Sequence, residues 1–233
     1  MKIVLIHGQS HKGSSYHIGT MLVENIEGEK EIKEFFLPRD LNHFCLGCYQ
    51  CIEGDEKCPY FEEKNEIMKE VEAADLLIFT TPTYCVHASA PLKSFIDMTF
   101  TYWMVHRPRA CMFLKRAVVI STAAGNGFKS AIKDVTTALF YWGVPEVKGY
   151  GLAVQAMNYE MISDKRKAKI KKDISVLAKK LSNKINKKPY VGIKTRIMFK
   201  IMGSMQAAGM GSSFLEKEYW EKNGWLQKNR PWK

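Results

Sequence analysis

The sequence predicts an α/β fold in which one parallel sheet of five strands is covered by helices on both faces. Two observations carry this prediction. Short apolar runs, rich in β-branched residues, alternate along the chain with segments of helical periodicity. At 233 residues, the chain is long enough for one well-buried domain and short for two. Because parallel strands need long right-handed crossovers, the alternation favours a parallel sheet.

The first half of the chain supplies three of the predicted strands. They are Lys2–Ile6, Glu31–Leu37, which Pro38 ends, and Asp75–Thr80. Apolar residues at helical spacing predict the helices between them: Ile18, Met21, Leu22 and Ile26 for the first, and Ile67, Met68 and Val71 for the second.

The second half supplies the other two strands. A helix carrying Leu92, Phe95 and Ile96 precedes the strand Arg116–Ser121, and a helix ending at Gly143 precedes the irregular strand Val144–Val154. Five such units form a doubly wound sheet, for which we predict the flavodoxin-like strand order 2-1-3-4-5. We predict that residues 1–188 form this domain and that residues 189–233 form a helical C-terminal arm, used in packing or oligomerisation.

The net charge of +11 is concentrated in one predicted helix. Lys165–Lys188 holds eleven basic residues and one acid, which leaves 24 basic and 23 acidic residues elsewhere. Its apolar residues fall on one helical face: Ile170, Ile174, Leu177, Leu181 and Ile185. A nucleic-acid-binding helix would carry more arginine or aromatic residues. The pattern therefore indicates a solvated lysine face and no nucleic-acid partner.

Membrane insertion and secretion are not expected. No apolar run approaches the roughly 20 residues of a membrane helix, and the apolar start of the chain is too short for a signal peptide. We therefore expect a cytoplasmic protein with reduced thiols. The predicted helix of the arm has an apolar face flanked by basic residues. This face could also contact a membrane surface, but packing is the preferred interpretation.

The loop "GQSHKGSSY", Gly8–Tyr16, has the chemistry of a phosphate site. It offers hydroxyls, the positive charge of His11 and Lys12, and the amides of the helix that follows. It lacks both the Walker lysine–serine ending and the spaced glycines of dinucleotide folds, so a monophosphate fits best.

Two further loops reach the same edge of the predicted sheet. "TPTYC" begins at Thr81 and offers backbone and an aromatic ring, while the small residues of "TAAGNG", Thr122–Gly127, allow a close backbone approach. One phosphate site and two walls for a planar group indicate FMN; the alternative is three tight turns without a ligand.

Together, "GQSHKGSSY", "TPTYCVHASAPLKSFID" and "STAAGNGFKS" resemble the three flavin loops of the NAD(P)H-dependent FMN reductase / flavodoxin-like oxidoreductase superfamily, over residues 1–187. Many relatives have serine in place of Gln9 and arginine in place of His11. The resemblance implies that FMN phosphate is held by Ser10, His11, Ser14, Ser15 and Tyr16. It implies that the isoalloxazine is flanked by Pro82, Thr83, Tyr84, Cys85 and Val86, and by Thr122, Ala123, Ala124, Gly125, Asn126 and Gly127.

Four of the six cysteines lie in "CLGCYQCIEGDEKCP" with the spacing C-x2-C-x2-C-x6-C. Serial C-x2-C steps let thiolates converge on a compact cluster. The pattern resembles the motif of iron–sulfur flavoproteins, a branch of the same superfamily, and implies a [4Fe–4S] cluster held by Cys45, Cys48, Cys51 and Cys58. Two alternatives stay open: unligated thiols at a subunit contact, or zinc or a disulfide. Cys85 and Cys111 are expected to be packing residues.

Other basic residues near the predicted edge are His87, His106, Arg107 and Arg109, which could steady reduced FMN or an NADPH phosphate, or form an ordinary surface loop. His7 is expected to be structural. In the arm, the tryptophans and an apolar helical arc suit a subunit interface, so we expect a homodimer or tetramer.

The sequence thus predicts an FMN-dependent oxidoreductase that passes electrons from NAD(P)H to a quinone-like, flavin or protein acceptor. No side chain is assigned as a catalytic acid or base. One alternative is an electron-transfer iron–sulfur flavoprotein that exchanges single electrons with a ferredoxin. A second is a non-redox binding protein on the same fold.

Overall fold

A parallel sheet forms the centre of the computed structural model, which describes residues 1–185 and 187–233. Its strands run in the order β2-β1-β3-β5-β6. Their bounds are β1 Lys2–His7, β2 Glu31–Phe36, β3 Leu76–Tyr84, β5 Arg116–Ala123 and β6 Glu146–Ala153. All of these strands pair in parallel. The predicted order is therefore confirmed for the parallel strands.

A sixth strand corrects the predicted count of five. β4, His87–Ala88, pairs antiparallel with Thr83 and Tyr84 at the end of β3. β3 also runs four residues past its predicted end at Thr80. Its last pair with β1 is Thr80 with His7, so at Pro82 β3 borders only β5. An edge position of this kind tolerates a proline, which explains why Pro82 does not end the strand.

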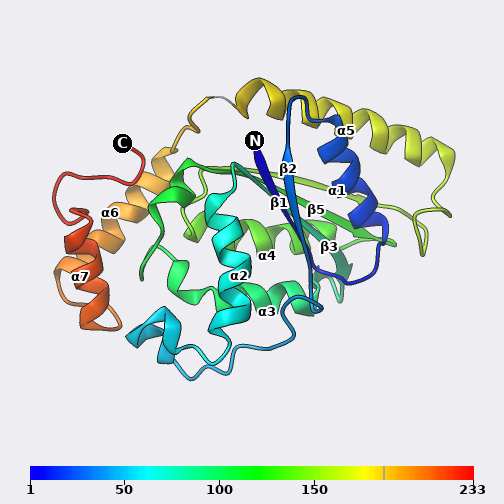
Figure 1. Cartoon of the computed structure of the whole chain (residues 1–233). Helices are drawn as coiled ribbons and strands as arrows, with labels where there is room; N and C mark the ends of the chain where they lie inside the picture. The colour runs from blue at the N-terminus through cyan, green and yellow to red at the C-terminus, as the bar shows by residue number, and fades with distance from the viewer. Residues whose placement is uncertain (186) are drawn as a thin grey trace.

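Helices cover both faces of the sheet (Figure 1). α1, Ser14–Asn25, and α5, Asp164–Ile185, pack on one face, where Ile3 and Leu5 of β1 point. α2, Phe61–Ala73, α3, Ala90–Met98, and α4, Phe128–Tyr141, pack on the other, where Val4 and Ile6 point. Both faces are apolar because successive side chains of a strand alternate between them. No helix in the described part of the chain is long and apolar enough to cross a membrane.

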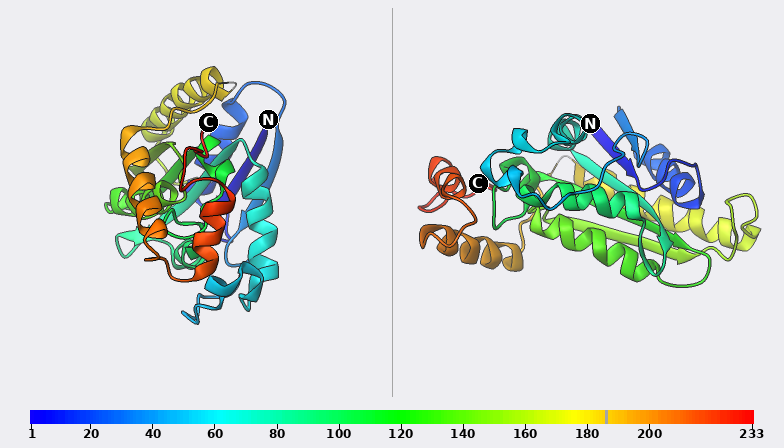
Figure 2. Two further views of the ribbon diagram at one scale, coloured as in Figure 1. Left: turned by 90° about the vertical axis from the view of Figure 1, so that its left-hand side faces the viewer. Right: turned by 90° about the horizontal axis from the view of Figure 1, so that it is seen from below.

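The C-terminal arm folds onto its own chain. It contains α6, Ile193–Ala207, and α7, Phe214–Lys222, and lies at the opposite end of the molecule from the start of α5 (Figure 2). A third apolar core joins it to the segment before β5, and its buried members are Met104, Phe113, Phe199, Trp220 and Trp225. Packing within the chain thus accounts for the buried tryptophans, and a role in oligomerisation stays a prediction.

Buried hydrogen bonds tie the arm to residues 104–109. Glu216 of α7 is fully buried and accepts a hydrogen bond of 2.7 Å from Nδ1 of His106. The amide of Ser212 donates to the same carboxyl group at 2.8 Å, and the Trp220 indole donates to the His106 carbonyl at 2.7 Å. Burial alone would raise the pKa of Glu216, but the His106 and Ser212 hydrogen bonds hold it below its usual range.

Acid is expected to loosen the arm through Glu216. Because its pKa is lowered on folding, the ionised carboxyl group stabilises the arm above the usual glutamate pKa of about 4.3, and this stability is lost as the pH falls further. We expect Glu216→Gln to lower the free energy of unfolding at pH 7 by about 2 kcal/mol, the range for hydrogen bonds to charged groups. Thermal unfolding at pH 7 and at pH 3.5 measures this loss. The difference in unfolding free energy between wild type and variant should be smaller at pH 3.5. An equal difference in unfolding free energy at both pH values would contradict a stabilising role for the ionised Glu216 carboxyl group.

Candidate functional site

The loops that follow β1, β3 and β5 meet at one edge of the sheet. The amide of Gly8 donates to the Thr80 carbonyl at 2.7 Å, and Oγ of Ser89 donates to the Gly8 carbonyl at 2.6 Å. A Cβ atom at position 8 would lie 2.5 Å from that Ser89 oxygen. A glycine is therefore needed where the first loop crosses the second, and the three predicted flavin loops begin from a fixed base.

The first loop leads into the uncapped start of α1. Gly13 is the N-cap residue and has no side chain to accept a hydrogen bond from the first-turn amides, which belong to Ser14, Ser15 and Tyr16. No acidic residue lies in that turn, while Lys12 precedes it. Positive helix-end charge without a carboxylate partner is the arrangement that binds phosphate.

The residues predicted to hold the phosphate differ in their exposure to solvent. Ser14 and Ser15 are buried at the helix start, whereas Ser10 and His11 are exposed on the loop. Oγ of Ser10 donates to the Leu37 carbonyl at 3.3 Å, which links this loop to the end of β2. Tyr16 is half-buried. The amides of the helix start are thus the fixed part of the site, and the exposed side chains are its adjustable part.

His7 lies behind this loop as a structural residue, as expected from the sequence. It is buried, and Nδ1 lies 2.8 Å from the Thr80 hydroxyl. Its ring packs on Phe36 and Tyr16, with centroids 4.5 and 5.0 Å away. Burial lowers the pKa of His7, although the neighbouring Glu34 opposes that shift.

The second loop is a tight hairpin between β3 and β4. Cys85 and Val86 form its turn with φ angles of 48° and 70°, a conformation that is unusual for a β-branched residue. Asp134 of α4 holds the hairpin by accepting hydrogen bonds of 3.0 Å from the Ala88 amide and from His87. Tyr84, Cys85 and Val86 are exposed, so the turn presents an apolar rim to solvent at the phosphate edge.

The third loop packs directly against this hairpin. Gly127, with φ of 96°, caps α4, and a Cβ atom there would lie 2.9 Å from Cα of Val86. The Thr83 and Ser121 hydroxyls are 2.9 Å apart. Ala124, Gly125 and Asn126 are exposed, whereas Thr122 and Ala123 are buried at the end of β5. The two predicted walls are therefore adjacent, and Thr122 and Ala123 could offer a ligand only their backbone.

A fourth loop at this edge was not predicted from the sequence. Residues 154–163 follow β6, and the amide of Gln155 donates to the Ala124 carbonyl at 3.0 Å. Tyr159 lies on His17 of α1, with ring centroids 4.7 Å apart. Met157 at its tip is 88% exposed. The loop links the third flavin loop to α1, and the only sequence signal for it is the polar stretch between two periodic segments.

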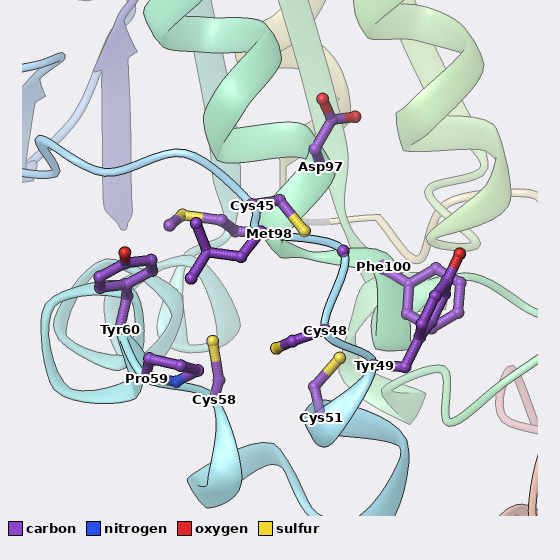
Figure 3. A pocket seen from close by; sticks show the side chains of 12 residues that line it. Cys45, Cys48, Tyr49, Cys51, Cys58, Pro59, Tyr60, Asp97, Met98 and Phe100 are labelled. Carbon is purple, nitrogen blue, oxygen red and sulfur yellow. The ribbon is translucent and has the colours of Figure 1, made fainter.

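The four motif cysteines line one cavity of about 370 Å³ (Figure 3). It lies between the cysteine loop, residues 42–60, and the end of α3, where Met98 and Phe100 complete its wall. The sulfur atoms of Cys48, Cys51 and Cys58 gather on one side of the cavity, and Cys45 lies nearer to Asp97. The motif therefore brings its cysteines to a common space, as the spacing predicted.

The arrangement separates the alternatives for this motif. All six cysteines are free, so the disulfide alternative is wrong for this structure. Among the described residues, no group of three or more His, Cys, Asp or Glu side chains converges tightly enough to hold a metal ion. A [4Fe–4S] cluster bonds each of its cysteine ligands to a different iron. Four cysteines line this cavity, so the residue types that such a cluster needs are present.

Because it follows the strand Glu31–Leu37, the cysteine loop is expected from the sequence to lie beside the flavin edge. The cavity lies instead at the other end of α3 from the flavin loops. The cysteine loop leaves the sheet at the flavin edge but then follows α3, where Oγ of Ser94 donates to the His43 carbonyl at 2.7 Å. The hairpin residues lie before the first residue of α3, Ala90, and the cavity lies at its last, Met98. At 1.5 Å per residue, a nine-residue helix separates the two sites by about 13 Å.

Two arginines hold the cysteine loop in place. Arg107 donates to the carbonyls of Cys51 and Ile52 and, at 3.0 Å, to the carboxyl group of Asp55. Arg109 forms an ion pair with the other oxygen of Asp55. Burial would raise the pKa of Asp55, but these guanidinium groups and the Thr101 hydroxyl hold it below its usual range.

These partners correct the assignment of the basic residues. Arg107, Arg109 and His106 were expected near the flavin, but the arginines clamp the cysteine loop and His106 pairs with Glu216. Of that group, only His87 lies at the flavin edge, on the hairpin. The segment 106–109 therefore joins the cysteine loop to the C-terminal arm.

Lys64 of α2 is a buried cation beside this loop. The residue is 2% exposed, and its Nζ atom is buried and has no hydrogen-bond partner. Burial raises the pKa of the Cys51 thiol, and the charge of Lys64 opposes that shift. An orphaned buried ammonium is costly unless an anion balances it. The first turn of α2, next to the cysteine loop, therefore holds a buried amine without a hydrogen-bond partner among the described residues.

Comparison with known proteins identifies the family. Residues 1–158 match the sequence model described as NADPH-dependent FMN reductase. The chain belongs to this family. As a member of the NADPH-dependent FMN reductase family it is an NAD(P)H-dependent oxidoreductase, which confirms the resemblance found in the sequence.

Curated relatives point to one branch of the family. An iron–sulfur flavoprotein of Archaeoglobus fulgidus is 27% identical over 154 residues, 65% of this chain and 68% of the relative. An iron–sulfur flavoprotein of Methanocaldococcus jannaschii is 27% identical over 143 residues, 58% and 69% of the two chains. An FMN-dependent NADH:quinone oxidoreductase of Shewanella loihica is 32% identical over 116 residues, 43% of this chain and 58% of the relative.

Solved structures share the fold. The FMN-dependent NADH-azoreductase of Bacillus anthracis, in complex with FMN, has a TM-score of 0.60 at 14% identity and covers 78% of this chain and 100% of its own. The NAD(P)H:quinone oxidoreductase of Methanothermobacter marburgensis has a TM-score of 0.59 at 17% identity and covers 81% and 98%. These likenesses confirm a flavodoxin-like α/β fold.

Proposed function

We propose that this oxidoreductase holds FMN at the edge formed by the first three loops. The observation that carries the proposal is the uncapped, acid-free start of α1, which lies at the same edge as the two predicted ring walls and would suit a dianionic phosphate. Bound FMN would accept a hydride from NAD(P)H and release electrons singly or in pairs. The first-turn amides of α1 would hold the phosphate, with the Ser14 and Ser15 hydroxyls and the exposed Ser10 and His11 beside them.

The walls would orient and shield the ring. The hairpin residues Pro82–Val86 would border it on one side, and the backbone of residues 122–127 on the other. Asp134 and the Thr83–Ser121 contact keep the walls in register, so the chain does not need to reorganise when a ligand enters. We assign no side chain at this edge as a catalytic acid or base, because FMN would carry the redox chemistry and the protein would supply positioning and electrostatics.

We further propose that Cys45, Cys48, Cys51 and Cys58 bind a [4Fe–4S] cluster. The common cavity, the orphaned Lys64 cation and the relatives named iron–sulfur flavoproteins support this assignment over unligated thiols. The cluster would supply one-electron chemistry. Thiolate ligands also suit the reducing cytoplasm that we expect for this chain.

The physiological acceptor can be a quinone-like molecule, a flavin or a protein. One observation favours a protein such as a ferredoxin: Phe44, Leu46 and Tyr49, next to the motif cysteines, are between 64 and 69% exposed. An apolar rim around a redox centre suits brief protein contacts. Electron transfer to a protein is therefore the second candidate function.

Anaerobic purification tests both parts of the proposal. We expect a flavin spectrum with a broad cluster absorbance, about four iron and four sulfide per chain if the cluster is [4Fe–4S], and steady NAD(P)H oxidation when a quinone is added. A flavin spectrum without iron would remove the cluster and leave the oxidoreductase intact. Negligible NAD(P)H oxidation together with fast single-electron exchange with ferredoxin would select the second candidate.

Oligomerisation remains a proposal for the arm. The exposed residues Ile193, Ile197 and Ile201 recur on one face of α6, and we expect a second copy of the chain to cover it in a homodimer or tetramer. The division into residues 1–188 and 189–233 is likewise a proposal, because the arm shares its core with residues 104–113 of the main domain.

A further inference from the structure

Lys64 occupies a position that is unfavourable for an unpaired cation on three counts. It lies in the fourth position of α2, near the positive end of the helix dipole. Its side chain belongs to the buried face of the helix, together with Ile67, Met68 and Val71. Its Nζ atom has no hydrogen-bond partner among the described residues, and no carboxylate there lies within 4.0 Å.

Lys115 shows how this chain treats a buried lysine when no ligand is involved. It is 4% exposed, and its Nζ atom donates to the carbonyls of Glu72 and Ala74 at 2.7 and 2.6 Å. Lys64 is at least as buried and has neither carbonyl nor carboxylate. The difference indicates that the partner of Lys64 is a group other than the protein itself.

The surroundings of Lys64 show where that partner would lie. α2 begins at Phe61, directly after Cys58, Pro59 and Tyr60, which line the cysteine cavity. Lys64 follows one helical turn after Tyr60. Because helix side chains lean toward the N-terminal turn, the Lys64 side chain leans toward the turn that adjoins the cavity. Asp55, a carboxylate of the same loop, is already paired with Arg107 and Arg109. The thiolates of the cavity are therefore the groups left on this side of α2 that can balance a buried positive charge.

We propose that Lys64 is the counter-charge of the cysteine-ligated cluster and sets its reduction potential. The inference rests on the proposed cluster. Four thiolates and a [4Fe–4S]²⁺ core would carry a net charge of −2, and one electron supplied by reduced FMN would make this charge −3, with no bond formed or broken. Because a nearby cation stabilises the more negative state more, Lys64 favours the reduced cluster. It is a positioning residue, which acts on the cluster without bonding to iron.

Two readouts separate this role from a purely structural one. Lys64→Met keeps the length and apolar stem of the side chain and removes its charge. In the loaded protein, we expect the cluster's one-electron equilibrium to shift about tenfold toward the oxidised form, a potential lower by about 59 mV. In protein stripped of iron, the same change removes an unbalanced charge, so the unfolding temperature should stay the same or rise.

The controls are Lys64→Arg, which keeps the charge, and Lys69→Met, which removes an exposed charge from the same helix. We expect both to match wild type in the redox titration, followed by electron paramagnetic resonance. A Lys64→Met variant that retains iron at the wild-type potential would overturn the proposal. So would a variant that destabilises the iron-free and loaded proteins equally.

Failure of the cluster assignment would look different. In that case wild type, after reconstitution, would hold FMN but no iron, and the inference would fall with it. Should Lys64→Met bind FMN but no iron, recovery of iron by Lys64→Arg would support the counter-charge, whereas iron loss in both variants would overturn it.

Discussion

Replacement of Gly13 by aspartate is expected to stabilise the flavin-free chain while it removes most of the affinity for FMN. The backbone of Gly13, with φ of −86° and ψ of −169°, is open to any residue. An added Cβ atom would meet only the end of the exposed His11 side chain, at 3.0 Å. Aspartate at this position would cap the first-turn amides and complement the helix dipole, a gain of about 0.5 kcal/mol.

The same carboxylate would compete with the phosphate for those amides and repel it. Loss of one or two hydrogen bonds to a charged group, at about 1.5–3 kcal/mol each, corresponds to roughly a hundredfold weaker FMN binding or more. Quenching of flavin fluorescence on titration measures the affinity, and thermal unfolding of the flavin-free protein measures the stability.

Two comparisons make this experiment decisive. Gly13→Asn caps the helix without charge, so it should lose less FMN affinity than Gly13→Asp. Riboflavin, which lacks the phosphate, should bind wild type and both variants alike. If Gly13→Asp bound FMN as tightly as wild type, the phosphate would not lie at the start of α1.

Replacement of Cys48 by alanine is expected to remove the cluster and to leave FMN in place. Cys48 lies in the middle of the cysteine loop, and α3 separates its cavity from the flavin loops by about 13 Å. With one of four ligands missing, we expect near-complete loss of cluster-bound iron and of its absorbance. Iron and sulfide assays, with the flavin spectrum of the same sample, measure the two cofactors separately.

Cys111→Ala is the matched control. Cys111 is half-buried against the core outside the cavity, and burial raises the pKa of its thiol. This variant should retain both iron and FMN. Loss of FMN in Cys48→Ala, with the fold intact by circular dichroism, would show that the two sites are not independent.

The sequence predicted the sheet and the flavin edge because both depend on local patterns. Apolar runs such as Lys2–Ile6 predict buried strands directly, and the residues of each flavin loop come immediately after one of these strands in the sequence. The end of β3 was misjudged at Pro82, because the rule that proline ends a strand does not hold where the neighbouring strand has already stopped.

The surroundings of the cysteines could not be predicted in the same way. Spacing showed that the four thiols can converge, but their place at the far end of α3 depends on contacts between distant segments, such as Ser94 with His43. Arg107 and Arg109 were assigned to the flavin because they lie close in sequence to a predicted flavin helix. Their actual partner, Asp55, is more than fifty residues away. Lys64 gave no sequence signal, because a lysine in an amphipathic helix is ordinarily solvated.

The contacts of residues 106–109 make the two redox sites unequal in what they depend on. The flavin edge is supported by the sheet and by α4, whose Asp134 holds the hairpin. The cysteine loop is held instead by Arg107 and Arg109, whose segment is in turn fixed by Glu216 and Trp220 of the arm. A chain clipped by a protease before α6 would therefore retain its flavin chemistry and lose the rigidity of its cysteine cavity. The cysteine loop thus depends on the arm for its position, whereas the flavin edge makes none of these contacts with it.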